Sequence, residues 1–289
     1  MNSEGSSDEI RVVLLDNGSL SGESVRQARS LAKLLSARIG RSVEAVSVLH
    51  SNRVDPRELD GVPGKIWKDC LEEISSSESR RIAVLPLFFG PSYGLRQARK
   101  LGQEFENEEE GRRIQWAEAL ASPSDDALET ILFHDAFQVL DTVGCNRVVG
   151  ESTGEPAVLL VDHGSPYEEV AACRDRLALN LAKKLGNRVG RVMACSMERR
   201  EGARYSFNEP LLEIALEEAA KERPSSIVLS RLFLFPGRHA GPGGDIERIC
   251  AASSWSENGH AIMQTPLLGT NVSMIDLLER RYRELEASV

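Results

Sequence analysis

The stretch that decides the fold is Ala157-Val158-Leu159-Leu160-Val161-Asp162-His163-Gly164-Ser165, a run of five apolar residues followed directly by a polar turn. An unbroken apolar run of this length is typical of a parallel strand that is covered on both faces. The turn places an acid, an imidazole and a hydroxyl at the carboxyl end of the strand. Because ligands bind at that end of open α/β sheets, the stretch predicts a binding site as well as a strand.

The same unit occurs twice in the chain. At a spacing of 146 residues, Asp16, Gly18 and Ser19 correspond to Asp162, Gly164 and Ser165. The match continues at this spacing, where Leu31, Ala32, Leu35, Ile39, Gly40, Val43 and Val46 fall on Leu177, Ala178, Leu181, Leu185, Gly186, Val189 and Val192. At a spacing of 145, Ile82, Leu87, Phe88 and Pro91 fall on Ile227, Leu232, Phe233 and Pro236. Near the end of each repeat, 119–131 parallels 266–278 at a spacing of 147. A repeat this long exceeds the period of solenoid arrays and predicts two similar domains.

We therefore expect an α/β fold of two tandem similar domains, each a parallel sheet flanked by helices. The expected domains are residues 1–150 and 151–289, joined by the polar, glycine-containing segment 150–156. A duplicated pair of this kind is expected to pack about a pseudo-twofold axis and to leave a cleft between its halves. The halves then take the place of a homodimer, so we expect a monomer.

Strands are expected in the first repeat at 10–16, 43–49 and 82–89, with helices leading up to Gly40 and over 65–76. Pro86 weakens the second half of the third strand, because proline cannot donate to the ladder. The acidic run 104–110 is expected to be solvated surface.

Composition narrows the class of protein. The chain has 289 residues, 41% of them hydrophobic, which suffices for a core in each half. No run approaches the ~20 apolar residues of a membrane span, and the first nine residues lack a basic or apolar signal region, so we expect a cytoplasmic protein. The five cysteines form no C-x-x-C pair and are expected to be reduced. A net charge of −9 disfavours nucleic acid as a partner.

The differences between the repeats point to function, because residues that both repeats share can be explained by the fold. His163 corresponds to Asn17. His239, in the glycine-rich loop 232–246, falls on Tyr93 or Gly94 in a shorter loop of the first repeat. The second repeat thus carries two histidines just past strand ends, and the first carries neither. His50, His134 and His260 form no such group and are assigned to structure or surface.

Two neighbouring imidazoles suit a transition metal, and a neutral imidazole can accept a proton near pH 7. The alternative is that each histidine only bonds backbone within its turn. The glycines do not match a phosphate-binding spacing, since GxxxxGK[ST] is absent and GxGxxG does not follow the first strand of either repeat. Each arginine near the strand ends can be explained singly as solvated surface, but as a group they could hold carboxylates: Arg199, Arg200, Arg204, Arg231 and Arg238. Ser165 beside His163 leaves a hydrolase open, without a G-x-S-x-G elbow.

These residues resemble the class II tetrapyrrole chelatases of the sirohydrochlorin chelatase type (the CbiX and SirB group), which are related in fold to ferrochelatase. The resemblance covers about 156–280 and rests on Asp162-His163-Gly164-Ser165, Met197-Glu198, Phe207-Asn208-Glu209-Pro210, Leu232 to His239, and Asp245-Ile246. It implies insertion of Fe²⁺ or Co²⁺ into a polycarboxylate tetrapyrrole in siroheme or cobalamin synthesis. The family's two histidines correspond to His163 and His239. The chain departs from the family pattern by carrying this pair in its second repeat and by an insertion before Phe207.

The resemblance implies a site in which His163 and His239 bind the metal and accept pyrrole protons, with Glu198 or Glu209 as a proton relay. Candidate substrate-binding residues are Ser165, Arg199, Gly237 and Arg238. The divalent metal (Fe²⁺, Co²⁺ or Ni²⁺) is a substrate, and no organic cofactor is expected. The alternative is a metal-binding or tetrapyrrole-binding protein that keeps the chelatase fold without turnover, which the eroded first repeat favours.

Overall fold

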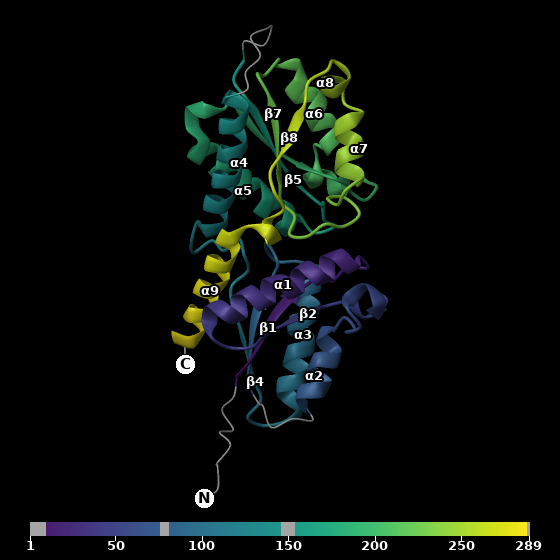
Figure 1. Cartoon of the computed structure of the whole chain (residues 1–289), viewed down its shortest axis with the longest axis vertical. Helices are drawn as coiled ribbons and strands as arrows, with labels where there is room; N and C mark the ends of the chain where they lie inside the picture. The colour runs from purple at the N-terminus through teal and green to yellow at the C-terminus, as the bar shows by residue number, and fades with distance from the viewer. Residues whose placement is uncertain (1–9, 76–80, 146–153, 288–289) are drawn as a thin grey trace, which may run out of the picture. The chain divides into compact units, whose positions relative to one another are not determined.

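The computed structural model describes residues 10–75, 81–145 and 154–287, and it divides into two compact units (Figure 1). Unit 1 comprises Met1–Ser122 and Val272–Val289, and unit 2 comprises Pro123–Asn271. Each unit has one four-stranded sheet in which every strand pair is parallel. The expectation of two similar parallel α/β units is confirmed.

Unit 1 has the strand order β2-β1-β3-β4. Its elements are β1 (Ile10–Asp16), α1 (Gly22–Ile39), β2 (Val43–Ser47), α2 (Trp67–Ser75), β3 (Arg81–Pro86), α3 (Tyr93–Glu108), β4 (Arg113–Trp116) and α9 (Val272–Ala287), with short 3-10 helices η1 (Ser51–Arg53) and η2 (Pro56–Leu59). The side chain of Ser21 caps the start of α1, and Gly40 ends it in the left-handed conformation at φ 69°. The predicted end of this helix is therefore confirmed.

Unit 2 has the equivalent strand order β6-β5-β7-β8. Its elements are α4 (Ala127–Cys145), β5 (Ala157–Asp162), α5 (Glu168–Leu185), η3 (Gly186–Arg188), β6 (Arg191–Ser196), η4 (Ala203–Asn208), α6 (Leu212–Lys221), β7 (Ile227–Arg231), α7 (Asp245–Ala251), α8 (Ser254–Glu257), β8 (Ile262–Gln264) and η5 (Leu268–Thr270). All six residues of β5 are buried, as its apolar run predicts.

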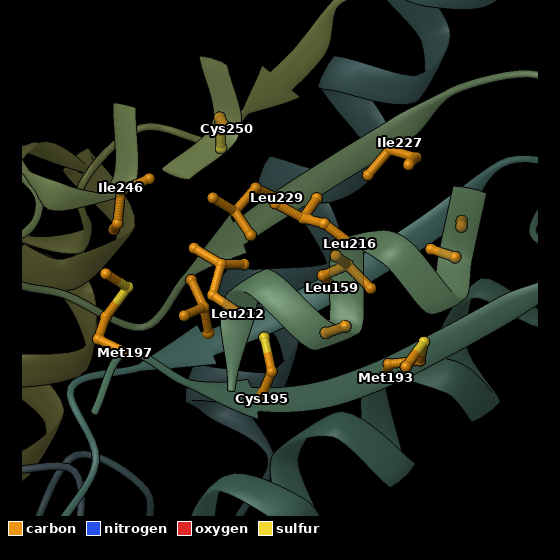
Figure 2. Packing of buried hydrophobic residues seen from close by; sticks show 14 of the residues in the cluster. Leu159, Met193, Cys195, Met197, Leu212, Leu216, Ile227, Leu229, Ile246 and Cys250 are labelled. Carbon is orange, nitrogen blue, oxygen red and sulfur yellow. The ribbon is translucent and has the colours of Figure 1, made fainter. Parts of the chain in front are cut away.

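The core of unit 2 on one side of the sheet is formed by inward residues of the strands and by α6 and α7 (Figure 2). Leu159 and Leu229 of the central strands meet Leu212 and Leu216 of α6, and all four are fully buried. Replacing any of these leucines by alanine costs about 2–5 kcal/mol in a core of this kind. This packing fixes the positions at which β5, β6 and β7 end.

Sheet register confirms the repeat and corrects one part of it. Asp16 lies opposite Ser47 in unit 1, and Asp162 lies opposite Ser196 in unit 2. Ser47 therefore corresponds to Ser196, and the predicted matches of Val43 with Val189 and of Val46 with Val192 are wrong by three residues. The short helix η3 between α5 and β6 accounts for the offset, because the α1–β2 connection has no equivalent helix.

The final helix of each sequence repeat packs in the unit built mainly from the other repeat. The helix α4 contacts α5 and β7 in unit 2, and α9 contacts α1 and β3 in unit 1. Ion pairs join each contact: Lys184 Nζ lies 2.7 Å from Asp126 Oδ2, and Arg38 Nε lies 3.3 Å from Glu279 Oε2. The compact units therefore divide the chain differently from the repeats 1–150 and 151–289.

Several local expectations are refined. The third strand ends at Pro86 rather than at Phe89, and the second ends at Ser47 rather than at Leu49. The acidic run is not solvated throughout, because Glu106 Oε1 accepts a hydrogen bond from Ile114 N at 2.8 Å.

Most of the expected linker lies outside the described residues. Free thiols are found at Cys70, Cys173, Cys195 and Cys250, and no helix in the described ranges is long and apolar enough to cross a bilayer.

Candidate metal centre

Three potential metal ligands follow three neighbouring strands of unit 2. His163 comes directly after β5, Glu198 lies two residues after β6, and His239 lies in the loop after β7. The backbone N–H of Glu198 donates to the carbonyl of His163 at 3.2 Å, which joins the first two turns. Gly164 makes this approach possible, because it has φ 88° and a Cβ there would lie 1.9 Å from the Glu198 carbonyl oxygen.

The two imidazoles face each other edge to face. Their Nε2 atoms are 3.1 Å apart, and the ring centroids are 4.6 Å apart at an interplanar angle of 79°. Glu198 Oε2 lies 3.9 Å from His239 Nε2, and Glu198 Oε1 lies 3.9 Å from His163 Nδ1. One ligand atom from each of the three residues falls within 4.8 Å of the others. This is the one such group found in the described residues.

The separation of the Nε2 atoms fits a single cation. Two nitrogen ligands at about 2.1 Å from one ion and about 90–110° apart are separated by about 3.0–3.4 Å. His239 is buried, whereas His163 and Glu198 are exposed, with 57% and 54% of their side chains accessible. The ligand set is therefore anchored on its His239 side and open to solvent on the other.

Each imidazole has a contact at its second nitrogen. His163 Nδ1 lies 3.2 Å from the carbonyl oxygen of Gly164, and His239 Nδ1 lies 2.8 Å from Asp245 Oδ2. The latter is a close contact that falls short of an aligned hydrogen bond. Such partners at the second nitrogen fix the tautomer of metal-binding histidines and direct Nε2 towards the ion. Asp245 is thus a functional candidate whose role the sequence analysis did not identify.

Burial lowers the pKa of His239, and the neighbouring His163 lowers it further, while Glu198 and Asp245 oppose the shift. The neutral imidazole is therefore favoured. Neutral nitrogen is the form that binds a cation or accepts a proton.

The glycine-rich loop serves to place His239. A Cβ on Gly244 would lie 2.5 Å from the His239 carbonyl oxygen and 2.8 Å from that of Arg238. The backbone N–H of Ile246, at the start of α7, donates to the same His239 carbonyl at 3.1 Å. The predicted substrate-binding residue Gly237 accepts from Gly241 N at 2.9 Å. The loop therefore folds back tightly on the helix start, as its glycine content allows.

The other predicted site residues lie around this group in different ways. The Glu209 carboxylate pairs with Arg199 Nε at 2.8 Å, and the group of potential metal ligands does not include it. The Ser165 hydroxyl accepts from Tyr167 N at 3.1 Å, as an ordinary turn residue does. Arg238 is 80% exposed, with Nε 3.3 Å from Asp245 Oδ2.

Unit 1 has none of the three ligands at the corresponding strand ends. Asn17 takes the place of His163, and Leu49, whose N–H donates to the Asn17 carbonyl at 3.2 Å, takes the place of Glu198. A Cβ on Gly94 would lie 2.3 Å from Asn17 Oδ1, so Gly94 lies where unit 2 brings His239 to His163. The sequence predicted that the first repeat lacks the two histidines. The structure shows that unit 1 also has Leu49 in place of Glu198.

Known proteins resemble the chain in both sequence and fold. The model of the CbiX family matches residues 157–285. Among solved structures, the chain is similar to SirB from Bacillus subtilis with Fe³⁺, with a TM-score of 0.66 and 15% identity over 97% of this chain and 96% of that one. It is also similar to CbiX, the terminal enzyme for biosynthesis of siroheme in denitrifying bacteria, with a TM-score of 0.57 and 14% identity over 95% and 98%. A search of curated proteins gave no match.

At these identities the two solved structures establish the fold alone, and the family match applies to residues 157–285. The matched region contains all three residues of the metal-ligand group. Residues 157–285 therefore match the CbiX family, and the fold of the whole chain is similar to those of the SirB and CbiX structures.

Proposed function

We propose that the chain inserts Fe²⁺ or Co²⁺ into sirohydrochlorin or a related tetrapyrrole, in the synthesis of siroheme or cobalamin. The observation that carries this proposal is the pair of Nε2 atoms 3.1 Å apart, with the Glu198 carboxylate beside them. Iron, cobalt and nickel all accept imidazole ligands, and relative affinity alone does not select among them.

Insertion exchanges one divalent cation for two pyrrole protons. In the proposed reaction His163 and His239 hold the cation through Nε2 and present it on the open side of the site. As the cation enters the macrocycle, the released imidazoles accept the pyrrole protons, and Glu198 passes them to solvent. The lowered pKa of His239 keeps this ring neutral and ready for both tasks.

Cationic side chains suit a substrate rimmed with carboxylates. Arg199, Arg200 and Arg204 come soon after Glu198 in sequence and are exposed or half-buried, and Arg238 precedes His239. We assign Arg199 and Arg238, with the loop backbone at Gly237, to substrate binding. Because Glu209 pairs with Arg199, we favour Glu198 over Glu209 as the proton relay.

Anaerobic incubation of the protein with sirohydrochlorin and Co²⁺ or Fe²⁺, followed by absorbance, tests the proposal. The expected result is insertion faster than in the protein-free control, with loss of at least about 100-fold in His163→Ala and in His239→Ala. Insertion by the double variant at the wild-type rate would show that the site is assigned wrongly.

The second candidate function is a metal-binding or tetrapyrrole-binding protein without turnover. The loss of all three ligand positions from unit 1 is the observation that favours it. Binding of Co²⁺ at the histidine pair without formation of the metallated product would select it over the enzyme.

A further inference from the structure

A buried residue of unit 2, Arg174, also has no counterpart of the same type in unit 1. The bounds of α1 and α5 correspond at the spacing of 146 residues, so Arg174 of α5 takes the position of Ala28 in α1. The side chain of Arg174 is 1% exposed. Burying a guanidinium is unfavourable unless its donors are paired, so its retention in unit 2 requires a reason.

The Arg174 side chain contacts the end of β6 and the 3-10 helix η4, which lie on either side of the turn that carries His163. Nη1 donates to the hydroxyl of Ser196 at the end of β6 and lies 3.6 Å from Asp162 Oδ1. Nη2 donates to the carbonyl of Phe207 in η4 at 3.0 Å, and Nη2 and Nε both donate to Asp175. The guanidinium therefore connects the end of the strand pair to η4.

Those two structures hold the turn that carries His163. Before the histidine, Asp162 Oδ1 accepts from Ser196 Oγ at 2.6 Å and from Gly164 N at 3.0 Å. After it, Asn208 pairs with the backbone of Ser165, accepting from its N–H at 2.9 Å and donating to its carbonyl at 2.8 Å. His163 lies between these two attachments, and its ring is exposed.

We propose that Arg174 is a positioning residue for His163. By bridging Asp162 and Ser196 to the Phe207–Asn208 end of η4, it fixes both ends of the turn and so the orientation of the imidazole. The consequence for metal binding rests on the proposed function, whereas the effect on the ring does not. Unit 1 supports the assignment, because it keeps Asp16 and Ser47 but has Ala28 where no imidazole has to be placed.

The geometry requires arginine in particular. A planar guanidinium can donate in two directions at once, whereas a lysine ammonium is a single point charge on a flexible stem. Residues that orient metal ligands in this indirect way typically change metal affinity about 10- to 100-fold when they are removed.

A metal-free experiment tests the positioning. The full chain is labelled with ¹⁵N-histidine, and the ring nitrogens of His163 are assigned by their loss in His163→Gln and recorded at one pH, about 8. Wild type is expected to show one tautomer, protonated at Nδ1. Arg174→Ala and Arg174→Lys are expected to show averaged ring shifts. The fold is expected to survive in Arg174→Ala, because unit 1 forms the same turn with alanine there.

Arg176→Ala is the matched control. It lies on the same helix and loses a comparable ion pair, Arg176 Nη1 to the buried Glu129 at 2.8 Å, away from the turn. It is expected to leave the His163 signals unchanged. Wild-type His163 signals in Arg174→Ala or in Arg174→Lys would overturn the proposal, and so would an equal change in Arg176→Ala.

Co²⁺ titration of the same proteins adds the link to function. Arg174→Ala is expected to weaken binding about 10- to 100-fold, and Arg176→Ala to leave it unchanged. If wild type binds no Co²⁺, the proposed function fails, while the histidine signals still decide whether Arg174 positions the ring.

Discussion

At the scale of residues, His163 is a clear difference between the two repeats, because Asn17 stands at its position in unit 1. The acid before it and the glycine and serine after it are shared with unit 1, and the structure gives each a backbone role in the turn. The sequence could predict the imidazole because a single difference stands out against shared neighbours. It could not predict the contact of His239 with Asp245, because the path of the intervening loop decides which acid lies nearby.

Asp16 is the counterpart of Asp162 in unit 1, where Ala28 stands in place of Arg174. Burial raises its pKa to about 6, opposed by hydrogen bonds from Ser47 and Gly18. One of its oxygens has no hydrogen-bond partner among the described residues. In the unfolded chain this carboxyl loses its proton near pH 4. Below pH 4 the carboxyl is protonated in both states and does not destabilise the fold. As the pH rises from 4 to about 6, the free energy of unfolding falls, because the folded state holds the proton more tightly than the unfolded state does.

Asp16→Asn is therefore expected to unfold like wild type at pH 4 and to be more stable by up to about 3 kcal/mol at pH 7.5. Denaturant unfolding can be followed in a Trp255→Phe background, in which the remaining tryptophans, Trp67 and Trp116, both report on unit 1. An identical pH dependence of stability with and without the Asp16 carboxyl would contradict the account.

At the scale of elements, apolar runs and glycines located the strands β1, β2, β3 and β5 and the helices α1 and α2. The central strands were predictable because they are buried on both faces, and α1 because a capping serine and a left-handed glycine delimit it. The register of β6 could not be predicted, because the short 3-10 helix η3 before it leaves no periodic pattern in the sequence. The folded-back loop after β7 was recognisable by its glycines, but their individual roles were not.

The glycines of the loop after β7 are expected to differ in how well they tolerate substitution by alanine. Gly244→Ala would bring a Cβ within 2.8 Å of three backbone carbonyl oxygens, those of His239, Gly241 and Arg238, and should lower the stability of unit 2 by about 1–3 kcal/mol and weaken Co²⁺ binding. Gly237→Ala meets no atom within 4 Å and should change neither. Thermal unfolding and Co²⁺ titration of the two variants provide the comparison. Equal behaviour would refute the role given to the loop.

At the scale of the whole molecule, the duplicated sequence predicted two units but not the exchange of their final helices. Nothing in the periodicity of α4 or α9 says which sheet it covers. Both helices lie at the same place in their repeats. Only the packing shows that α4 covers β7 and α5, with Leu128, Ile131 and Leu132 buried.

This exchange predicts how the chain can be cut. A fragment of residues 123–271 contains α4 and all three metal ligands and is expected to unfold cooperatively and to bind Co²⁺. A fragment of residues 151–289 lacks α4 and leaves the apolar face of α5 and β7 uncovered, so it is expected to be less stable or to aggregate. Calorimetry of both fragments checks this, and a higher melting temperature for 151–289 would contradict it.

The most direct test of the central claim is whether the cation held by His163 and His239 is the one that enters the macrocycle. The protein is loaded anaerobically with one equivalent of Fe²⁺ enriched in a heavy stable isotope and mixed with sirohydrochlorin and excess unlabelled Fe²⁺, and the first turnover is analysed by mass spectrometry. We predict labelled product from wild type and none from the His163→Ala/His239→Ala double variant. Product that carries only the unlabelled metal would contradict the account.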